Sequence, residues 1–153
     1  MISNCIVQCC VWEEEANIAV TFNCARQPID IDLFASHLFD VHESPALPDI
    51  LVISIQEIAP VPHSLIGGAF VAPYFARFEE AVRVAVQKRD GENIHSDYKI
   101  VSKKAIGMTG IMVFAKDKSA IDNIETAGVG VGMWKNGQQG SSRCQVLISR
   151  QEQ

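Results

Sequence analysis

Two polar residues stand at the ends of strand-like runs and are the best candidates for chemistry. Glu57 closely follows the hydrophobic run 49–55, and Asn23 lies at the end of the alternating run 17–24. In layered α/β proteins, ligand sites open at strand ends because the surrounding loops form a crevice there. A carboxylate suits a hard cation such as Mg²⁺, which takes oxygen ligands, keeps waters and borrows further ligands from a phosphate. The amide oxygen of Asn23 could bind or orient the same ion.

Both residues also have an ordinary structural interpretation. A carboxylate such as Glu57 can cap the loop that follows a strand, and Asn23 can form an Asx-turn with its own backbone. Residue type and spacing alone favour this structural interpretation over a metal site.

Other candidates for chemistry are weaker. No metal-ligand spacing is found among the four histidines: His37, His42, His63 and His95. These histidines could be combined with Cys9 and Cys10 into a zinc site, but their spacing is better explained by chance. The glycines of 128–132 alternate as in a strand and no helical pattern follows them, so they do not fit a phosphate-binding loop.

The strands that must position Asn23 and Glu57 are predicted by two kinds of pattern. Residues 17–24 alternate between apolar and polar or small residues, which is typical of a strand. Residues 49–55 are apolar on both alternating faces, which indicates a strand covered on both sides in a layered α/β fold.

Helices and further strands are predicted around these two strands. A short helix capped by Asp30 or Asp32 extends to about Phe39, and 71–86 form the strongest amphipathic helix. The chain between 60 and 68 is interpreted as a Pro- and Gly-rich loop. The other expected elements are a polar loop over 88–97, antiparallel strands over 98–105 and 108–115, a short helix over 119–124, a strand over 125–133, and no convincing element from Trp134 onward.

Composition narrows the class of protein. The chain has 153 residues, of which 48% are hydrophobic and 20% charged, and its net charge is −5. These values fit one ordinary globular domain and argue against a generic nucleic-acid or membrane-surface binder, since both need a basic footprint. No apolar run is long enough for a membrane span, and the N-terminus has no basic region typical of a secretory signal. The five cysteines contain no Cys-x-x-Cys pair, so we expect free thiols and a cytoplasmic location.

Three segments together carry a family resemblance. Residues 21–26 read Thr-Phe-Asn-Cys-Ala-Arg, residues 47–58 read Leu-Pro-Asp-Ile-Leu-Val-Ile-Ser-Ile-Gln-Glu-Ile, and residues 125–132 read Glu-Thr-Ala-Gly-Val-Gly-Val-Gly. In this order and spacing, they resemble the N-terminal half of an inositol polyphosphate 5-phosphatase domain of the endonuclease/exonuclease/phosphatase superfamily, especially its fungal branch. The resemblance covers 17–133 and implies a truncated part of a four-layer α-β-β-α sandwich.

The resemblance also implies an activity and roles for two residues. It implies Mg²⁺-dependent removal of the 5-phosphate from phosphatidylinositol phosphates or soluble inositol phosphates, with membrane contact only through a lipid substrate and no nucleic acid as partner. Glu57 matches the family's Mg²⁺-binding carboxylate, and Asn23 matches the asparagine that supports the metal and the phosphate. In such a mechanism, the ion stabilises charge on the phosphoryl and leaving-group oxygens, while a His/Asp pair activates water.

The end of the chain departs from the family in a specific way. The family continues with Met-Gly-Asn-Lys-Gly-Ala-Val-Gly-Val-Arg, encoded for example by ATG-GGC-AAC-AAG-GGA-GCA-GTC-GGT-GTC-AGG. Preceded by one A and read one nucleotide earlier, this messenger gives AAT-GGG-CAA-CAA-GGG-AGC-AGT-CGG-TGT-CAG, which encodes residues 136–145 of this chain. A divergent surface tail is the alternative, but chance agreement through every one of these codons is improbable. We therefore predict a change of reading frame between Val131 and Asn136, which the transcript sequence would reveal.

These observations divide the chain into three parts. Residues 1–16 are interpreted as an atypical N-terminal extension, 17–133 as the N-terminal half of the phosphatase domain, and 134–153 as an out-of-frame tail. Because the later family motifs carry the catalytic Asp and His, we expect the chain itself to be inactive. Two alternatives remain: a nuclease of the same superfamily, and a non-catalytic fragment that acts only by binding.

Overall fold

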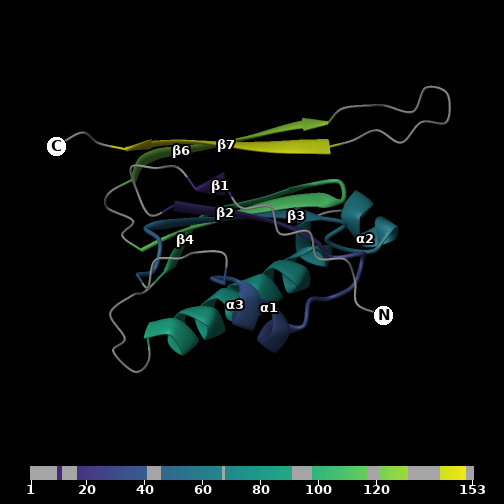
Figure 1. The fold of residues 1–153 in the computed structure, drawn as a ribbon. Helices are drawn as coiled ribbons and strands as arrows, with labels where there is room; N and C mark the ends of the chain where they lie inside the picture. Colours follow the sequence, from purple (N-terminus) through teal and green to yellow (C-terminus); the bar gives the residue numbers. More distant parts are fainter. Residues whose placement is uncertain are drawn as a thin grey trace.

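The described part of the chain is layered, with helices on one face of a sheet and a second sheet over the other face (Figure 1). The computed structural model describes residues 10–11, 17–40, 46–66, 68–90, 98–116, 121–130 and 142–150. The elements, in chain order, are β1 Cys10–Val11, β2 Asn17–Asn23, α1 Ile31–His37, β3 Ile50–Gln56, α2 Val61–Ile66, the 3₁₀-helix η1 Gly68–Phe70, α3 Ala72–Asp90, β4 Lys99–Ile106, β5 Thr109–Ala115, β6 Ile121–Gly130 and β7 Ser142–Arg150.

The main sheet has five strands in the order β1-β2-β3-β5-β4. β2 and β3 are parallel and pair in register from Asn17 opposite Ile50 to Asn23 opposite Gln56. β5 runs antiparallel to both β3 and β4. The turn between β4 and β5 contains Gly107, whose φ of 56° lies in the left-handed region that glycine adopts without strain. The second sheet consists of antiparallel β6 and β7, which contact β4 and β5.

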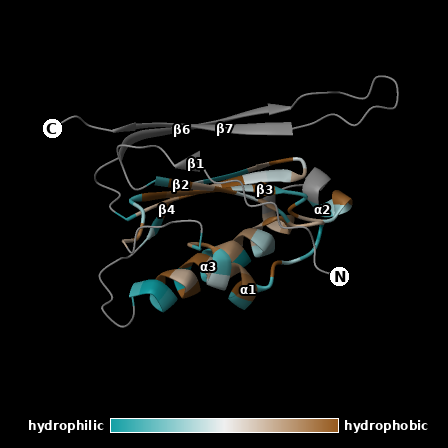
Figure 2. Cartoon of the chain, viewed as in Figure 1, coloured by the Kyte–Doolittle hydropathy of each residue, from teal (hydrophilic) through white to brown (hydrophobic). Residues whose placement is uncertain are grey.

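The main core lies between the helices and the five-stranded sheet, where hydrophobic residues concentrate (Figure 2). Phe34 of α1 and Phe78 of α3 meet edge to face with ring centroids 5.2 Å apart, and Phe22 of β2 lies 5.1 Å and 6.0 Å from them. On the central strand β3, Leu51, Ile53 and Ile55 are fully buried. Burial of these side chains on one face of the sheet specifies the register in which β2 pairs with β3.

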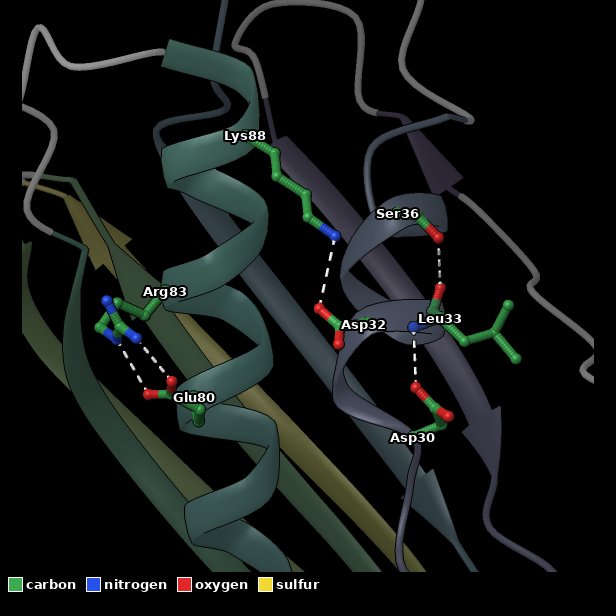
Figure 3. Close-up of polar contacts among 7 residues, drawn as sticks. All are labelled: Asp30, Asp32, Leu33, Ser36, Glu80, Arg83 and Lys88. Atoms are coloured by element: carbon green, nitrogen blue, oxygen red, sulfur yellow. Dashed lines mark hydrogen bonds and ion pairs between the residues drawn. The ribbon is translucent and has the colours of Figure 1, made fainter.

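Most of the predicted elements are confirmed. The strands predicted over 17–24 and 49–55 are β2 and β3, and the predicted strand pair over 98–105 and 108–115 is β4 and β5. Asp30 is the N-cap of α1, because its carboxylate accepts a hydrogen bond from the Leu33 N–H at 3.0 Å (Figure 3). The strongest predicted helix is α3. The mixed α/β fold class predicted from the two-faced apolar strand is also confirmed.

Four local predictions are wrong. Within the predicted loop over 60–68, α2 forms, and Pro62 lies in its first turn, where a missing N–H is tolerated. Lys88 to Asp90 continue α3 rather than beginning a loop. Residues 121–124 belong to β6 instead of a helix, and β7 forms where no element is expected. The reason is pairing: β6 and β7 satisfy each other's backbone groups, which local pattern alone does not reveal.

The remaining parts of these predictions, over 91–97, 119–120, 131–141 and 151–153, lie outside the described residues. Among the helices that the structure describes, none combines the length and apolarity needed to cross a membrane.

Candidate functional site

Asn23 and Glu57 lie at the same edge of the five-stranded sheet. Asn23 is the last residue of β2 and is paired with Gln56, the last residue of β3, and Glu57 follows directly. This adjacency follows from the parallel pairing of β2 and β3, whose carboxyl ends must share one edge. The backbone therefore places the two residues at the ends of neighbouring strands of one sheet.

Asn23 makes the Asx-turn that its position allows. Its Oδ1 atom accepts a hydrogen bond from the Ala25 N–H at 2.8 Å. An amide oxygen has two lone pairs and the adjacent NH₂ group is a donor, so this turn uses only part of the hydrogen-bonding capacity of Asn23. The turn fixes the side chain at the strand end while it keeps an acceptor position and two donors for a ligand.

Glu57 forms an ion pair with Arg26, a residue from the loop that follows β2. The Arg26 Nε–H donates to Glu57 Oε2 at 3.2 Å, and the two side chains are 51% and 38% exposed. Exposed ion pairs of this kind contribute only about 0.2–1 kcal/mol to stability. Stability is therefore a weak reason for this pairing.

The backbone on both sides of this ion pair is in an unusual conformation. Ala25, Arg26 and Glu57 have φ angles of 49°, 63° and 48°, in the left-handed region. For a residue with a Cβ, this region costs about 1–2 kcal/mol relative to ordinary conformations. Two backbone hydrogen bonds offset the strain: the Cys24 N–H donates to the Gln56 carbonyl at 2.8 Å, and the Arg26 N–H donates to the Glu57 carbonyl at 2.9 Å. Strain held in this way is typical of functional sites.

A further backbone contact holds the chain next to Glu57. The next residue, Ile58, is fully buried, and its N–H donates to the Met108 carbonyl in the β4–β5 turn at 3.1 Å. Gly110 permits this packing, because a Cβ at that position would lie 3.1 Å from Ile58 Cδ1 and 3.2 Å from the Phe75 ring. The backbone at Glu57 is therefore anchored between two loops.

The segment after Asn23 is anchored as well. The guanidinium of Arg77 on α3 donates from Nε and Nη2 to the Ile29 carbonyl at 2.9 Å and 2.7 Å. This contact ties the connection between β2 and α1 to the long helix. The loop that carries Arg26 is thus held at both of its ends.

The site offers one carboxylate and one amide as oxygen ligands. In the described ranges, no group of three or more His, Cys, Asp or Glu residues could hold a metal ion. A transition-metal cage is therefore not built here from described residues, but Mg²⁺ often binds through one or two carboxylates, with waters and substrate phosphate completing its shell. Glu57 and Asn23 fit that minimal type of site.

The histidines have other surroundings where they are described. His37 Nδ1 lies 2.7 Å from Asp40 Oδ2 on the exposed end of α1, and His63 Nδ1 lies 3.4 Å from the Tyr74 hydroxyl. His42 and His95, together with Cys9, lie outside the described residues.

One residue of the site was not predicted to have a role. Arg26 belongs to the 21–26 segment that carries the family resemblance, yet nothing in the spacing pairs it with Glu57, which lies 31 residues away. The available signal was a basic residue in the loop directly after a strand whose neighbour ends in a carboxylate. Only the parallel pairing of β2 with β3 turns that signal into a contact.

Comparison with known proteins bears on the family and the fold. A family model described as endonuclease/exonuclease/phosphatase family 2 matches residues 20–152. No match is found among curated proteins. The residues matched by the family include β7 and most of the predicted out-of-frame tail. The change of reading frame in that tail stays a prediction.

Two solved structures have a similar fold. The inositol polyphosphate 5-phosphatase domain of synaptojanin, crystallised with inositol (1,4)-bisphosphate and calcium ion, has a TM-score of 0.60 and 17% identity over 85% of this chain and 35% of that chain. A mutant Cimex nitrophorin in its ferrous nitric oxide complex has a TM-score of 0.50 and 14% identity over 88% of this chain and 42% of that chain. At these identities the matches show the fold, and the fold alone does not determine the chemistry.

The family match includes the strand ends that carry Asn23 and Glu57. The matched residues begin within β2, include both Asn23 and Glu57, and continue to the end of β7. The family groups nucleases and phosphatases, which are hydrolases of phosphate esters. Because its model covers most of this sequence, the chain belongs to the endonuclease/exonuclease/phosphatase family 2.

Proposed function

We propose that this chain contains the cation-binding edge of a Mg²⁺-dependent phosphatase domain that removes the 5-phosphate from inositol polyphosphates or phosphatidylinositol phosphates. The single observation that carries the proposal is that Asn23 ends β2 opposite Gln56, the last residue of the parallel strand β3, and that Glu57 follows Gln56 directly, in a chain of this family. The synaptojanin domain of similar fold was crystallised with an inositol bisphosphate and calcium, which supports a substrate of this chemical class and a divalent cation.

The roles of the two residues follow from their chemistry. The Glu57 carboxylate would hold the cation, and Asn23 would orient the phosphate through its NH₂ donors while its oxygen completes the turn with Ala25. The bound cation would supply positive charge that stabilises the phosphoryl and leaving-group oxygens. The anchored backbone at both residues keeps this geometry fixed before substrate arrives, which is the condition for effective electrostatic stabilisation.

Complete turnover is proposed for a longer protein. The chain spans 35% of the synaptojanin domain, and the water-activating His/Asp pair is expected in the remainder. We propose that the chain alone binds the cation without efficient hydrolysis, and that residues 134–153 represent a change of frame in the gene. Sequencing the transcript across the codons of 131–136 tests this; an intact codon series with no alternative frame would contradict it.

A pair of matched variants tests the role of Glu57. In the frame-restored protein, Glu57→Gln should lower turnover of a phosphoinositide at least about 100-fold. The substitution keeps the volume of the side chain but removes the negative charge that would hold the cation. Glu80→Gln is the control, because Glu80 is also a carboxylate paired with an arginine, Arg83, but lies on α3 (Figure 3). It should leave turnover unchanged. Near-normal rates for Glu57→Gln would return Glu57 to a structural role.

Two further measurements separate the alternatives. A comparison of phosphoinositide with abasic DNA as substrates of the frame-restored protein distinguishes a phosphatase from a nuclease; the net charge of −5 favours the phosphatase. A Mg²⁺ titration of this chain, followed by thermal unfolding, tests cation binding directly. Stabilisation that disappears in Glu57→Gln supports the proposal, whereas no stabilisation at millimolar Mg²⁺ favours a fragment that acts only by binding.

A further inference from the structure

The contact between Arg26 and Glu57 is held by the backbone as well as by the side chains. The Arg26 Nε–H donates to Glu57 Oε2 at 3.2 Å, and the Arg26 backbone N–H donates to the Glu57 carbonyl at 2.9 Å. Both residues have left-handed φ angles, of 63° and 48°. Two strained loops that are joined in this way keep the guanidinium beside the carboxylate.

The other ion pairs of the described residues differ in their surroundings. Arg83 and Glu80 form a two-pronged pair within α3, with Nε–Oε2 and Nη2–Oε1 distances of 2.9 Å and 2.5 Å. Lys88 of α3 reaches Asp32 of α1 at 3.6 Å (Figure 3). Lys103 Nζ of β4 lies 2.8 Å from Glu79 Oε1 of α3. Each of these three pairs includes a residue of α3. In the described structure, Arg26 is the cation whose ion-pair partner is the carboxylate at the end of β3.

The pairing of Arg26 is incomplete, which leaves it able to bind a second partner. It engages Glu57 through Nε alone, so the two terminal nitrogens of the guanidinium remain as donors. Half of the Arg26 side chain is exposed. A guanidinium with several outward donors is well suited to a phosphate, because its planar fork matches two phosphate oxygens.

We infer that Arg26 exchanges partners during binding: it pairs with Glu57 before the cation binds, and it binds the phosphate of the substrate once the cation holds Glu57. The inference rests on the proposed role of Glu57. A cation and the Arg26 guanidinium compete for the same carboxylate, so each weakens the binding of the other. A phosphate ligand that draws Arg26 away removes the competition, and cation and phosphate therefore strengthen each other's binding. By linkage, the strengthening is equal in both directions.

The test measures Mg²⁺ binding to this chain by titration calorimetry, with and without inositol (1,4)-bisphosphate. In Arg26→Gln, Mg²⁺ should bind about two- to fivefold more tightly than in the unmodified chain, as expected for removal of a competing exposed ion pair. The inositol bisphosphate should tighten Mg²⁺ binding in the unmodified chain, and should do so by a smaller factor in Arg26→Gln, where only direct contact between phosphate and cation remains. Arg83→Gln, which breaks the matched pair on α3, should behave as the unmodified chain.

A spectroscopic signal reports the exchange without any turnover. The Nε–H resonance of Arg26, assigned by its loss in Arg26→Gln, should shift when Mg²⁺ is added. The same resonance should already be shifted in Glu57→Gln before any metal is present. The Nε–H resonance of Arg83 should not move in either experiment.

The outcomes separate the inference from the proposed function. Mg²⁺ binding that depends on Glu57 but is unchanged in Arg26→Gln overturns the exchange and leaves the proposed function standing. Tighter Mg²⁺ binding in Arg26→Gln, with an effect of the inositol bisphosphate that is equal in Arg26→Gln and in the unmodified chain, overturns the phosphate contact of Arg26. Mg²⁺ binding that is absent, or that is equal in Glu57→Gln, contradicts the proposed function, and the inference fails with it.

Discussion

The helix-covered face of the main sheet and the carboxyl-terminal edge of β2 and β3 are adjacent in sequence but follow different physical rules. Phe22 packs among aromatic rings of α1 and α3, whereas the next residue, Asn23, turns its amide oxygen back to the chain. Ile55 is fully buried, and two residues later Glu57 has a left-handed backbone and a side chain 38% exposed. Burial of apolar side chains in the first region stabilises the fold. The strained backbone of the second region costs part of that stability and fixes the positions of the polar side chains.

The contrast teaches how this fold separates stability from chemistry. The apolar face needs only residues of the right size in the right register, and tolerates no polar group without a partner. The strand edge keeps polar atoms accessible, and holds them by backbone hydrogen bonds between two loops. Substitutions in the two regions should therefore differ in sign as well as in size.

The largest expected effect is in the packed region. Phe78 is 1% exposed and contacts the rings of Phe22 and Phe34. Phe78→Ala should lower the free energy of unfolding by about 3–5 kcal/mol, because it removes a large buried side chain and leaves a cavity. Urea denaturation followed by circular dichroism measures this. Leu33→Ala, on a side chain 61% exposed, is the control and should change stability by less than about 0.5 kcal/mol.

An intermediate effect is expected at Tyr98, whose partner lies just before the amino end of β3. Its hydroxyl donates to the Pro48 carbonyl, and burial together with the nearby Asp49 and Asp90 raises the pKa of the phenol. The pKa of Tyr98 in the folded state lies above its value of about 10 in the unfolded state. The contribution of the neutral Tyr98 hydroxyl to the free energy of unfolding is therefore fully present below pH 10 and is lost as the pH rises beyond 10.

The comparison of the unmodified chain with Tyr98→Phe measures the contribution of the Tyr98 hydroxyl to stability. Below pH 9, Tyr98→Phe should be less stable by about 1 kcal/mol, the value of one hydrogen bond to a partly buried acceptor. Above pH 10, the difference should shrink as the unfolded phenol ionises. Denaturant titrations between pH 8 and 11.5 measure the difference, and a gap independent of pH would contradict the cause assigned to the shift.

The smallest effect has the opposite sign and lies at the strand edge. Ala25 has a φ of 49°, which glycine adopts without steric penalty. Ala25→Gly should therefore raise the free energy of unfolding by up to about 1 kcal/mol, after the greater flexibility of the unfolded glycine is included. Ala76→Gly, on the exposed face of α3, is the matched control and should lower it by about 1 kcal/mol. Equal destabilisation by both changes would show that the edge stores no strain at Ala25.

Much of the fold could be predicted from local patterns. The two-faced apolar run of β3, the alternation of β2 and the amphipathic face of α3 all follow from periodicity, because burial selects the same residues that the pattern displays. The prediction failed in several segments, including β7 and α2. β7 forms against β6, and α2 begins at a proline-containing segment whose sequence alone is typical of a loop.

The candidate site shows the same division. Asn23 and Glu57 could be identified because a polar residue directly after a buried strand is conspicuous, and the family resemblance gave each a role. Arg26 could not, since its significance depends on a contact across 31 residues. The left-handed backbone of Ala25, Arg26 and Glu57 could not be predicted from the sequence either, because none of these is a residue type that commonly adopts this conformation.

By itself, the sequence determined which segments are buried, which residues end the central strands and which family the chain resembles, because side-chain periodicity and residue type are local properties. The tertiary structure alone decided that β2 lies parallel beside β3, and that Arg26 therefore meets Glu57. That decision depends on how α1 and α3 cover one face of the sheet, which sets the register of the strands and brings their polar ends to a common edge.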